Sequence, residues 1–319
     1  MLRVHRGEGG GWRTTTGLEA ARAAAAGLAR HPAWFEAVVP DTAEQAFLLE
    51  QLHLPKDSLE DSLQPHHPPL LRELEGHLMA IVHAPEPGLE VHTRKISLFL
   101  GRGWLVSVVR RELPLLDPLR PTLERNPDYY LGKPERILHA ILHHLCDVFE
   151  ERVDEMIDCA EELEERSLER AATDTLEKLQ QLRRRTAALA RVVRAQRDVM
   201  QALARGGNPL IPRAEEPYLR DVADHMLRIY DLLEAVRDGI LAARDAHLTA
   251  MNTELNVTMR TLTAVATLLL PLSLLAGLFG MNFRAMPLID RPWGVWALLG
   301  LMALVGGCTW RWLRGRRWL

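Results

Sequence analysis

The chain has 319 residues, a formal net charge of −3 and three cysteines. A chain this close to neutral lacks the basic excess of a general nucleic-acid binder, so nucleic acid is not expected as a partner. The cysteines (Cys146, Cys159 and Cys308) show no CxxC spacing. A disulfide framework or zinc finger is therefore not expected, and a reducing compartment fits best.

Residues 1–130 are predicted to form an α/β domain. The first 30 residues are rich in Gly, Arg and Ala and are expected to be irregular with some helix, and Asp41 is a suitable N-cap for the helix that follows it. Gly101-Arg102-Gly103 predicts a hairpin. Runs typical of strands, separated by Gly and Pro signals, occur at residues 34–39, 70–74, 77–83, 89–100 and 104–110.

Long helices are predicted from residue 131 onward. A helical hairpin is expected within residues 131–216, because residues 136–169 have helical periodicity with an acidic face and residues 175–204 are basic. Opposite charges are predicted on the facing surfaces of these two helices. Since no proline occurs between Pro217 and Pro271, a stalk helix at residues 217–256 is expected to continue into an apolar segment, giving a rod of roughly 95 Å at 1.5 Å per residue.

Two apolar segments have the length of membrane spans, which need about 20 residues. They are residues 257–281 and 293–312, joined by a loop at residues 282–292. Tryptophans at both ends of the second segment suit the two membrane interfaces, and the tail at residues 313–319 is basic. The positive-inside rule then predicts cytoplasmic termini, an external loop and lipid as a partner. A buried hairpin of a soluble protein is the alternative.

Residues recur every seven positions along the predicted rod, which indicates lengthwise packing against copies of the same helix. In a ring of identical subunits, one such column would line a cation path, with Met259 and Leu262 as an apolar constriction. Its first part consists of aspartates, namely Asp224, Asp231, Asp238 and Asp245. The alternative is that these aspartates form a solvated face balanced by nearby arginines. The predicted pore-lining residues are Asn252, Asn256, Met259, Leu262, Ala266, Leu270, Ser273 and Gly277.

The first apolar segment ends in Gly280-Met281-Asn282, and Met286-Pro287, the second segment and a basic tail follow. This order resembles the CorA magnesium-transporter family, whose signature is the GMN tripeptide. The resemblance is close over residues 245–319 and looser before them. It implies an α+β membrane protein of the inner membrane that forms a funnel-shaped homopentamer, with cytoplasmic α/β domains, a ring of stalk helices and a pore lined by the first span.

The same resemblance implies the roles of individual residues. Gly280, Met281 and Asn282 would form the selectivity site, where a ring of asparagine carbonyls could bind the water shell that Mg²⁺ sheds reluctantly. The alternative is that Asn282 only caps the helix. Cytoplasmic Mg²⁺ bound between subunits would favour the closed state, with Asp245 at the matching stalk position and Glu86 as its suggested partner. The alternative is that both acids are ordinary surface residues that bind no metal.

These observations favour a passive channel for Mg²⁺, and also for Co²⁺ and Ni²⁺, driven by the membrane potential and gated by cytoplasmic Mg²⁺. A potential of 100 mV supplies roughly 4.6 kcal/mol for a divalent cation, and no nucleotide-binding motif is present in the sequence. No enzyme activity is expected, and no cofactor beyond the transported and regulatory divalent cation.

Two alternatives stay open: a proton-coupled Zn²⁺ transporter of the same fold, similar to ZntB, and a non-conducting membrane-anchored scaffold or sensor. Arg284 and Leu288 leave the identity of the transported ion undecided, because many family members carry an acidic residue soon after the Met-Pro of this loop.

Three histidines remain outside this interpretation. His139, His143 and His144 have i, i+4 spacing that suits a pair of metal ligands. The sequence shows no cysteine or carboxylate that completes a convincing tetrahedral set with them. They are therefore interpreted as surface or packing histidines.

Overall fold

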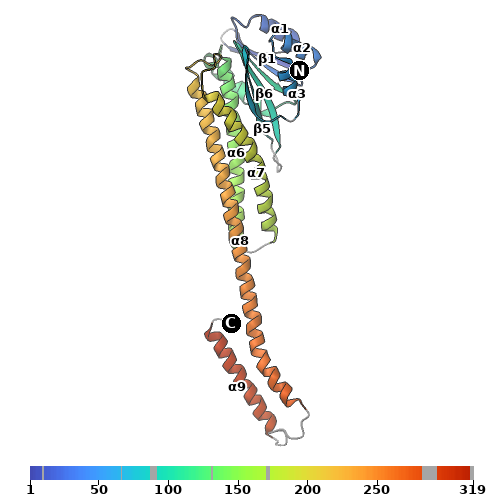
Figure 1. Ribbon diagram of the computed structural model, residues 1–319, viewed down its shortest axis with the longest axis vertical. Helices are drawn as coiled ribbons and strands as arrows, with labels where there is room; N and C mark the ends of the chain where they lie inside the picture. The colour runs from blue at the N-terminus through green and yellow to red at the C-terminus, as the bar shows by residue number, and fades with distance from the viewer. Residues whose placement is uncertain are drawn as a thin grey trace. The chain divides into compact units, whose positions relative to one another are not determined.

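The computed structural model describes residues 1–8, 11–65, 67–86, 92–130, 132–169, 173–281 and 293–316. The chain divides into two compact units (Figure 1). The first unit comprises Met1–Glu165 and Thr173–Ala243, and the second comprises Arg166–Ala172 and Arg244–Leu319. The first unit holds a sheet and its covering helices, whereas the second holds two apolar helical segments.

The elements follow one another in a simple order. The N-terminal part contains β1 (Leu2–Glu8), β2 (Gly11–Thr16), α1 (Leu18–Ala26), β3 (Ala33–Val38), α2 (Thr42–Glu50), α3 (Lys56–Leu63), β4 (Leu70–Leu74), β5 (His77–Pro85), β6 (Thr93–Gly101) and β7 (Trp104–Val109). A 3₁₀ turn (Pro114–Leu116) and the short helices α4 (Leu119–Arg125) and α5 (Pro127–Tyr130) lead to the long helices. These are α6 (Pro134–Glu169), α7 (Thr173–Ala204), α8 (Glu216–Phe279) and α9 (Gly294–Gly315).

The sheet has seven strands in the order β2-β1-β3-β7-β6-β5-β4. Strands β3 and β7 pair in parallel, and the other neighbouring strands are antiparallel. Successive side chains of a strand point to opposite faces, so β5 sends Leu78 and Val82 into one hydrophobic cluster and Met79 and Ile81 into another. Because both faces of the sheet are covered, its central strands are apolar almost throughout.

Different helices cover the two faces of the sheet. Helices α1 to α3 pack on the face that carries Met79, where Phe47 of α2 and Leu59 of α3 are buried. The long helices cover the other face, and α7 contacts both β4 and β5. Gln196 of α7 accepts a hydrogen bond from the backbone N–H of His83 in β5. This contact ties the helical bundle to the sheet.

The prediction for residues 1–30 is wrong over its first half. Residues 2–8 and 11–16 form strands β1 and β2, and α1 is the helical part. The local strand signal is weak, because only Leu2 and Val4 of β1 are fully buried hydrophobic residues and β2 is an edge strand of mostly polar composition. Their pairing in the sheet therefore decides their structure, and local composition does not.

Two local predictions in the α/β domain are confirmed. Asp41 caps α2 through a capping box, in which its Oδ1 accepts from the backbone N–H of Glu44 at 2.8 Å and its own N–H donates to Glu44 Oε2 at 3.1 Å. Strands β6 and β7 form the predicted hairpin. Gly103 lies in its turn with φ of 84°, a conformation that glycine adopts without a steric penalty.

The predicted helical hairpin is present as α6 and α7, but the expectation about its facing surfaces is wrong. Met156 and Leu163 of α6, and Leu182 and Leu189 of α7, are buried in one hydrophobic cluster. Burying charges between the helices would cost desolvation energy, whereas apolar contact stabilises the pair. The acidic and basic residues therefore occupy the more exposed sides.

The long rod is confirmed. Helix α8 has 64 residues and continues through Pro271. Helix α9 follows as the second apolar segment, with 22 residues. The predicted external loop at residues 282–292 lies outside the described residues.

Candidate cation pathway

The second unit presents apolar side chains that the chain itself leaves uncovered. The C-terminal part of α8 and helix α9 are each long and apolar enough to cross a membrane, and little of either is buried. Leu262, Leu270 and Trp296 are 70%, 69% and 75% exposed. Exposure of this extent is typical of surfaces that lipid or another protein covers.

The predicted pore-lining residues occupy one side of α8. Successive helix residues are rotated by about 100°, so the eight positions fall within an arc of roughly 120°. All eight residues are exposed: Asn252, Asn256, Met259, Leu262, Ala266, Leu270, Ser273 and Gly277. We call this side the pathway face. Its composition changes from amide groups at Asn252 and Asn256 to small residues at Ser273 and Gly277.

The opposite side of α8 carries the residues that are least exposed. Ala264 is buried, and Leu268, Leu272 and Leu275 are half-buried. With about 100° per residue, these positions lie roughly opposite the pathway face. A Cβ atom built on Gly306 of α9 would come within 3.8 Å of the Leu272 side chain, and Figure 1 shows α9 running alongside this part of α8. Helix α9 therefore covers the back of α8 and leaves the pathway face free.

The GMN tripeptide lies at the end of α8. The N–H of Gly280 donates to the carbonyl oxygens of Ala276 and Gly277, at 3.0 and 3.2 Å. A Cβ at Gly280 would come within 3.2 Å of the Ala276 oxygen, so a larger residue would crowd this turn. Met281 is 50% exposed, and Asn282 lies outside the described residues. The selectivity role of these three residues stays a prediction.

The two suggested regulatory acids have different surroundings. Asp245 is exposed on α8, and its carboxylate forms no ion pair with another described residue. Its backbone oxygen accepts a hydrogen bond from Thr249 Oγ1 at 2.8 Å. A carboxylate without an ion pair is available to a cation. The regulatory role of Asp245 stays a prediction.

Glu86 already has a cationic partner. It forms an ion pair with Arg94, whose hydrogen bond is the main reason that the pKa of Glu86 lies below its ordinary value. It lines a cavity of about 220 Å³ together with four basic residues, Arg94, Lys95, Arg110 and Arg111. Burial, together with the smaller effect of the Arg110 charge, lowers the pKa of Lys95 to about 8. These surroundings favour an anion over a cation, and the role of Glu86 as a metal ligand stays a prediction.

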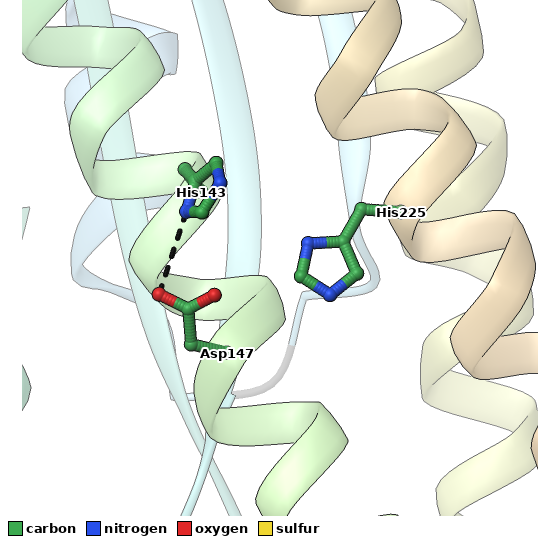
Figure 2. A group of neighbouring side chains, drawn as sticks. All are labelled: His143, Asp147 and His225. Atoms are coloured by element: carbon green, nitrogen blue, oxygen red, sulfur yellow. Dashed lines mark ion pairs between the residues drawn. The ribbon is translucent and has the colours of Figure 1, made fainter.

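One group of potential metal ligands was missed by reasoning from sequence. The first unit brings His143 and Asp147 of α6 to His225 of α8 (Figure 2). The i, i+4 spacing of His143 and Asp147 was visible in the sequence. His225 is far along the chain, and only the packing of α8 against α6 reveals it.

Comparison with known proteins identifies the class to which this chain belongs, the membrane transporters of divalent cations. The family model described as "CorA-like Mg2+ transporter protein" matches residues 30–317. The chain therefore belongs to the CorA-like family. Its long helix, two apolar segments and N-terminal α/β domain are the architecture of that family.

Individual relatives carry different names. The chain is 29% identical over 268 residues to the cobalt/magnesium transport protein CorA of Thermotoga maritima, which covers 82% of this chain and 76% of the relative. It is 26% identical over 230 residues to the zinc transport protein ZntB of Pectobacterium atrosepticum, which covers 70% and 68%.

A solved structure shares the fold over the full length. The complete structure of the CorA magnesium transporter from Methanocaldococcus jannaschii matches with a TM-score of 0.83 at 21% identity, covering 100% of this chain and 99% of that one.

Proposed function

We propose that this transporter is a passive channel for Mg²⁺ uptake, also permeable to Co²⁺ and Ni²⁺, and that the pathway face of α8 lines its pore. The observation that carries the proposal is the uncovered pathway face, which leads to Gly280 and Met281 in a chain of the CorA-like family. The pathway face carries amide and hydroxyl oxygens on either side of an apolar constriction at Met259 and Leu262. Such a neutral path suits a hydrated divalent cation, because it need not strip the water shell.

The pore requires several copies of the chain, and we propose a homopentamer. One helix cannot enclose a path, and the pathway face would meet lipid in a single copy. Its amide groups would then lie at the edge of the hydrocarbon without hydrogen-bond partners. A polar group without such a partner costs several kcal/mol of free energy within the hydrocarbon itself. In a ring of copies, the pathway faces point toward a shared axis and α9 of each copy lies outside.

We propose that the protein lies in the inner membrane with both termini in the cytoplasm. Arg260 precedes the apolar part of α8, and Arg311 and Arg314 lie near the end of α9. Since the two helices form a hairpin, these arginines lie at the same membrane face. Arg314 also stacks on the Trp310 ring at 5.3 Å, which suits the interface between headgroups and hydrocarbon.

Uptake of ions into proteoliposomes tests the transport mechanism. A passive Mg²⁺ channel takes up Mg²⁺ under an inside-negative potential, and a pH gradient changes the rate little. Co²⁺, Ni²⁺ and Zn²⁺ are compared under the same two conditions. Uptake that needs the proton gradient and prefers Zn²⁺ would instead support a ZntB-like transporter. A protein that is tight to all four ions under every condition would support a scaffold or sensor.

The selectivity site is tested with Asn282→Ala. We expect this variant to lose selective Mg²⁺ uptake while its oligomer remains assembled, because the ring of amide carbonyls is removed without loss of helix packing. Leu304→Ala is the matched control, since Leu304 is exposed on α9 and has no part in the proposed pore. Wild-type selectivity in Asn282→Ala would contradict the role of Asn282.

The gate is tested with Asp245→Asn, which we expect to weaken inhibition of uptake by internal Mg²⁺. The amide keeps the shape of the side chain and removes the charge that holds the cation. Asp154→Asn removes an exposed carboxylate from α6 as a control. Equal inhibition in the wild type and Asp245→Asn would remove Asp245 from the gating mechanism.

A further inference from the structure

The helical bundle of the first unit holds a compact group of three potential ligands. His143 and Asp147 lie one turn apart on α6, and His225 faces them from α8 (Figure 2). One ligand atom from each residue lies within 4.8 Å of the other two. His143 Nδ1 is 3.4 Å from Asp147 Oδ2, and the rings of His143 and His225 are 5.6 Å apart at 69°.

A fourth residue orients His225. Glu150 Oε2 lies 2.9 Å from His225 Nε2, which leaves Nδ1 as the ring nitrogen available to an ion. A carboxylate bound to the outer nitrogen of a metal-ligating histidine fixes the tautomer and the orientation of the ring. Glu150 is therefore a positioning residue.

The burial of the group suits a site that is rigid and still accessible. The side chain of His225 is 9% exposed, while those of His143 and Asp147 are 42% and 47% exposed. Ligand atoms around a tetrahedral ion at about 2.0 Å lie about 3.3 Å from one another. Rotation of the partly exposed side chains of His143 and Asp147 would bring the three ligand atoms to this distance from one another.

The neighbouring thiol does not belong to the group. Cys146 precedes Asp147, but its side chain is fully buried and its Sγ lies 3.9 Å from the carbonyl oxygen of Val222. The donor set consists of two imidazole nitrogens and one carboxylate oxygen.

We propose that His143, Asp147 and His225 bind one transition-metal ion of the Zn²⁺, Co²⁺ and Ni²⁺ class, with water in the remaining positions. Imidazole nitrogen favours these ions, whereas Mg²⁺ prefers an octahedral set of oxygens. The bound ion would join α6 to α8, the helix that continues into the pathway face. This site does not depend on the proposed channel function, because its binding is measured without transport.

The experiment measures metal binding by the full-length protein in detergent. After treatment with a chelator, the protein is titrated with ZnCl₂ by calorimetry and with CoCl₂ by visible absorption. The wild type is expected to bind one more Zn²⁺ per chain than Asp147→Asn or His143→Asn and to show a Co²⁺ absorption band that both variants lack. A large excess of Mg²⁺ should leave this Zn²⁺ bound.

Two further variants complete the test. Glu150→Gln should keep the stoichiometry and weaken binding by roughly 10- to 100-fold, as expected for loss of a residue that orients a ligand. His31→Asn removes an exposed histidine of the α/β domain and should bind as the wild type does. Because His143 and Asp147 are half-exposed, their variants should fold, which circular dichroism checks. Equal Zn²⁺ stoichiometry and equal Co²⁺ spectra in the wild type, His143→Asn and Asp147→Asn would overturn the proposal.

Discussion

The two units of this chain differ in the burial of their apolar side chains. In the first unit, large side chains such as Trp34, Phe99 and Phe149 are fully buried between the sheet and its helices. In the second unit, Ala264 and Leu313 are the only buried hydrophobic residues among those that the structure describes. Both units are rich in apolar residues, so composition alone does not separate them.

The difference shows which part of the molecule is complete by itself. The first unit closes a core from its own strands and helices, and it should be stable as a single copy. The second unit carries its apolar surface outward, and under the proposed function lipid and further copies of the chain cover that surface. Transport is expected from the unit that the single chain leaves incomplete.

The sharpest contrast should come from removing one large side chain in each unit. Phe149→Ala opens a cavity in a core where Phe149 is fully buried, so it should lower the free energy of unfolding by about 3–5 kcal/mol. Leu270→Ala, at a position that is 69% exposed, should change this quantity little. Urea unfolding in detergent, followed by circular dichroism, measures both. Equal losses of unfolding free energy in the two variants would contradict this difference between the two units.

A buried charge in the first unit should have the next largest effect. Glu36 is buried, and its carboxylate lies 3.0 Å from Arg120 Nη2 and 3.2 Å from His5 Nε2. Burial acts to raise the pKa of Glu36, but hydrogen bonds and charges from His5 and Arg120 outweigh it and lower the pKa. Glu36→Gln should therefore cost about 3 kcal/mol at neutral pH, because it leaves the partly buried guanidinium of Arg120 without its carboxylate partner.

The pH dependence of Glu36→Gln follows from the lowered pKa. A carboxyl group whose pKa is lower in the folded state stabilises the fold above its ordinary pKa, and this stabilisation disappears as the pH falls through the folded value. The difference between the wild type and Glu36→Gln should thus be full at pH 7 and shrink as the solution is acidified below the ordinary carboxyl range. Unfolding curves over a pH series check this, and a constant difference would contradict the assigned ion pairs.

The smallest expected effect concerns the capping box of α2. Asp41→Ala removes the acceptor for the Glu44 N–H and should destabilise the first unit by about 1 kcal/mol. Asp57→Ala is a matched control, because Asp57 is exposed in the first turn of α3, a helix whose N-cap makes no side-chain hydrogen bond. The two variants are compared by their urea midpoints. A larger loss for Asp57→Ala would contradict the role of the capping box.

Features that depend on short-range patterns were predictable from the sequence. The long helices have clear periodicity and few prolines, the apolar segments have membrane length, and Asp41 and Gly103 carry local signals for a cap and a turn. The seven-residue spacing on α8 led to the pathway face, which the structure leaves free of α9, and its role in lining a pore stays a prediction.

Features that depend on distant contacts were not predictable. Strands β1 and β2 have weak local signals and become strands through pairing with β3 and with each other. The facing surfaces of α6 and α7 depend on which side of each helix carries the charged residues, and the net charge of a helix does not give this. His225 joins His143 only through the packing of two helices whose contact no local spacing reveals.

Cysteine modification in liposomes tests the central claim most directly. In a background of Cys159→Ser and Cys308→Ala, which keeps only the buried Cys146, one cysteine is introduced in each variant. The positions are Ser273 and Gly277 on the pathway face, and Leu275 on the side that faces α9. A positively charged methanethiosulfonate reagent added during Mg²⁺ uptake should block the first two variants and leave Leu275→Cys active. Equal block at all three positions, or block only at Leu275, would contradict a cation path along this face of α8.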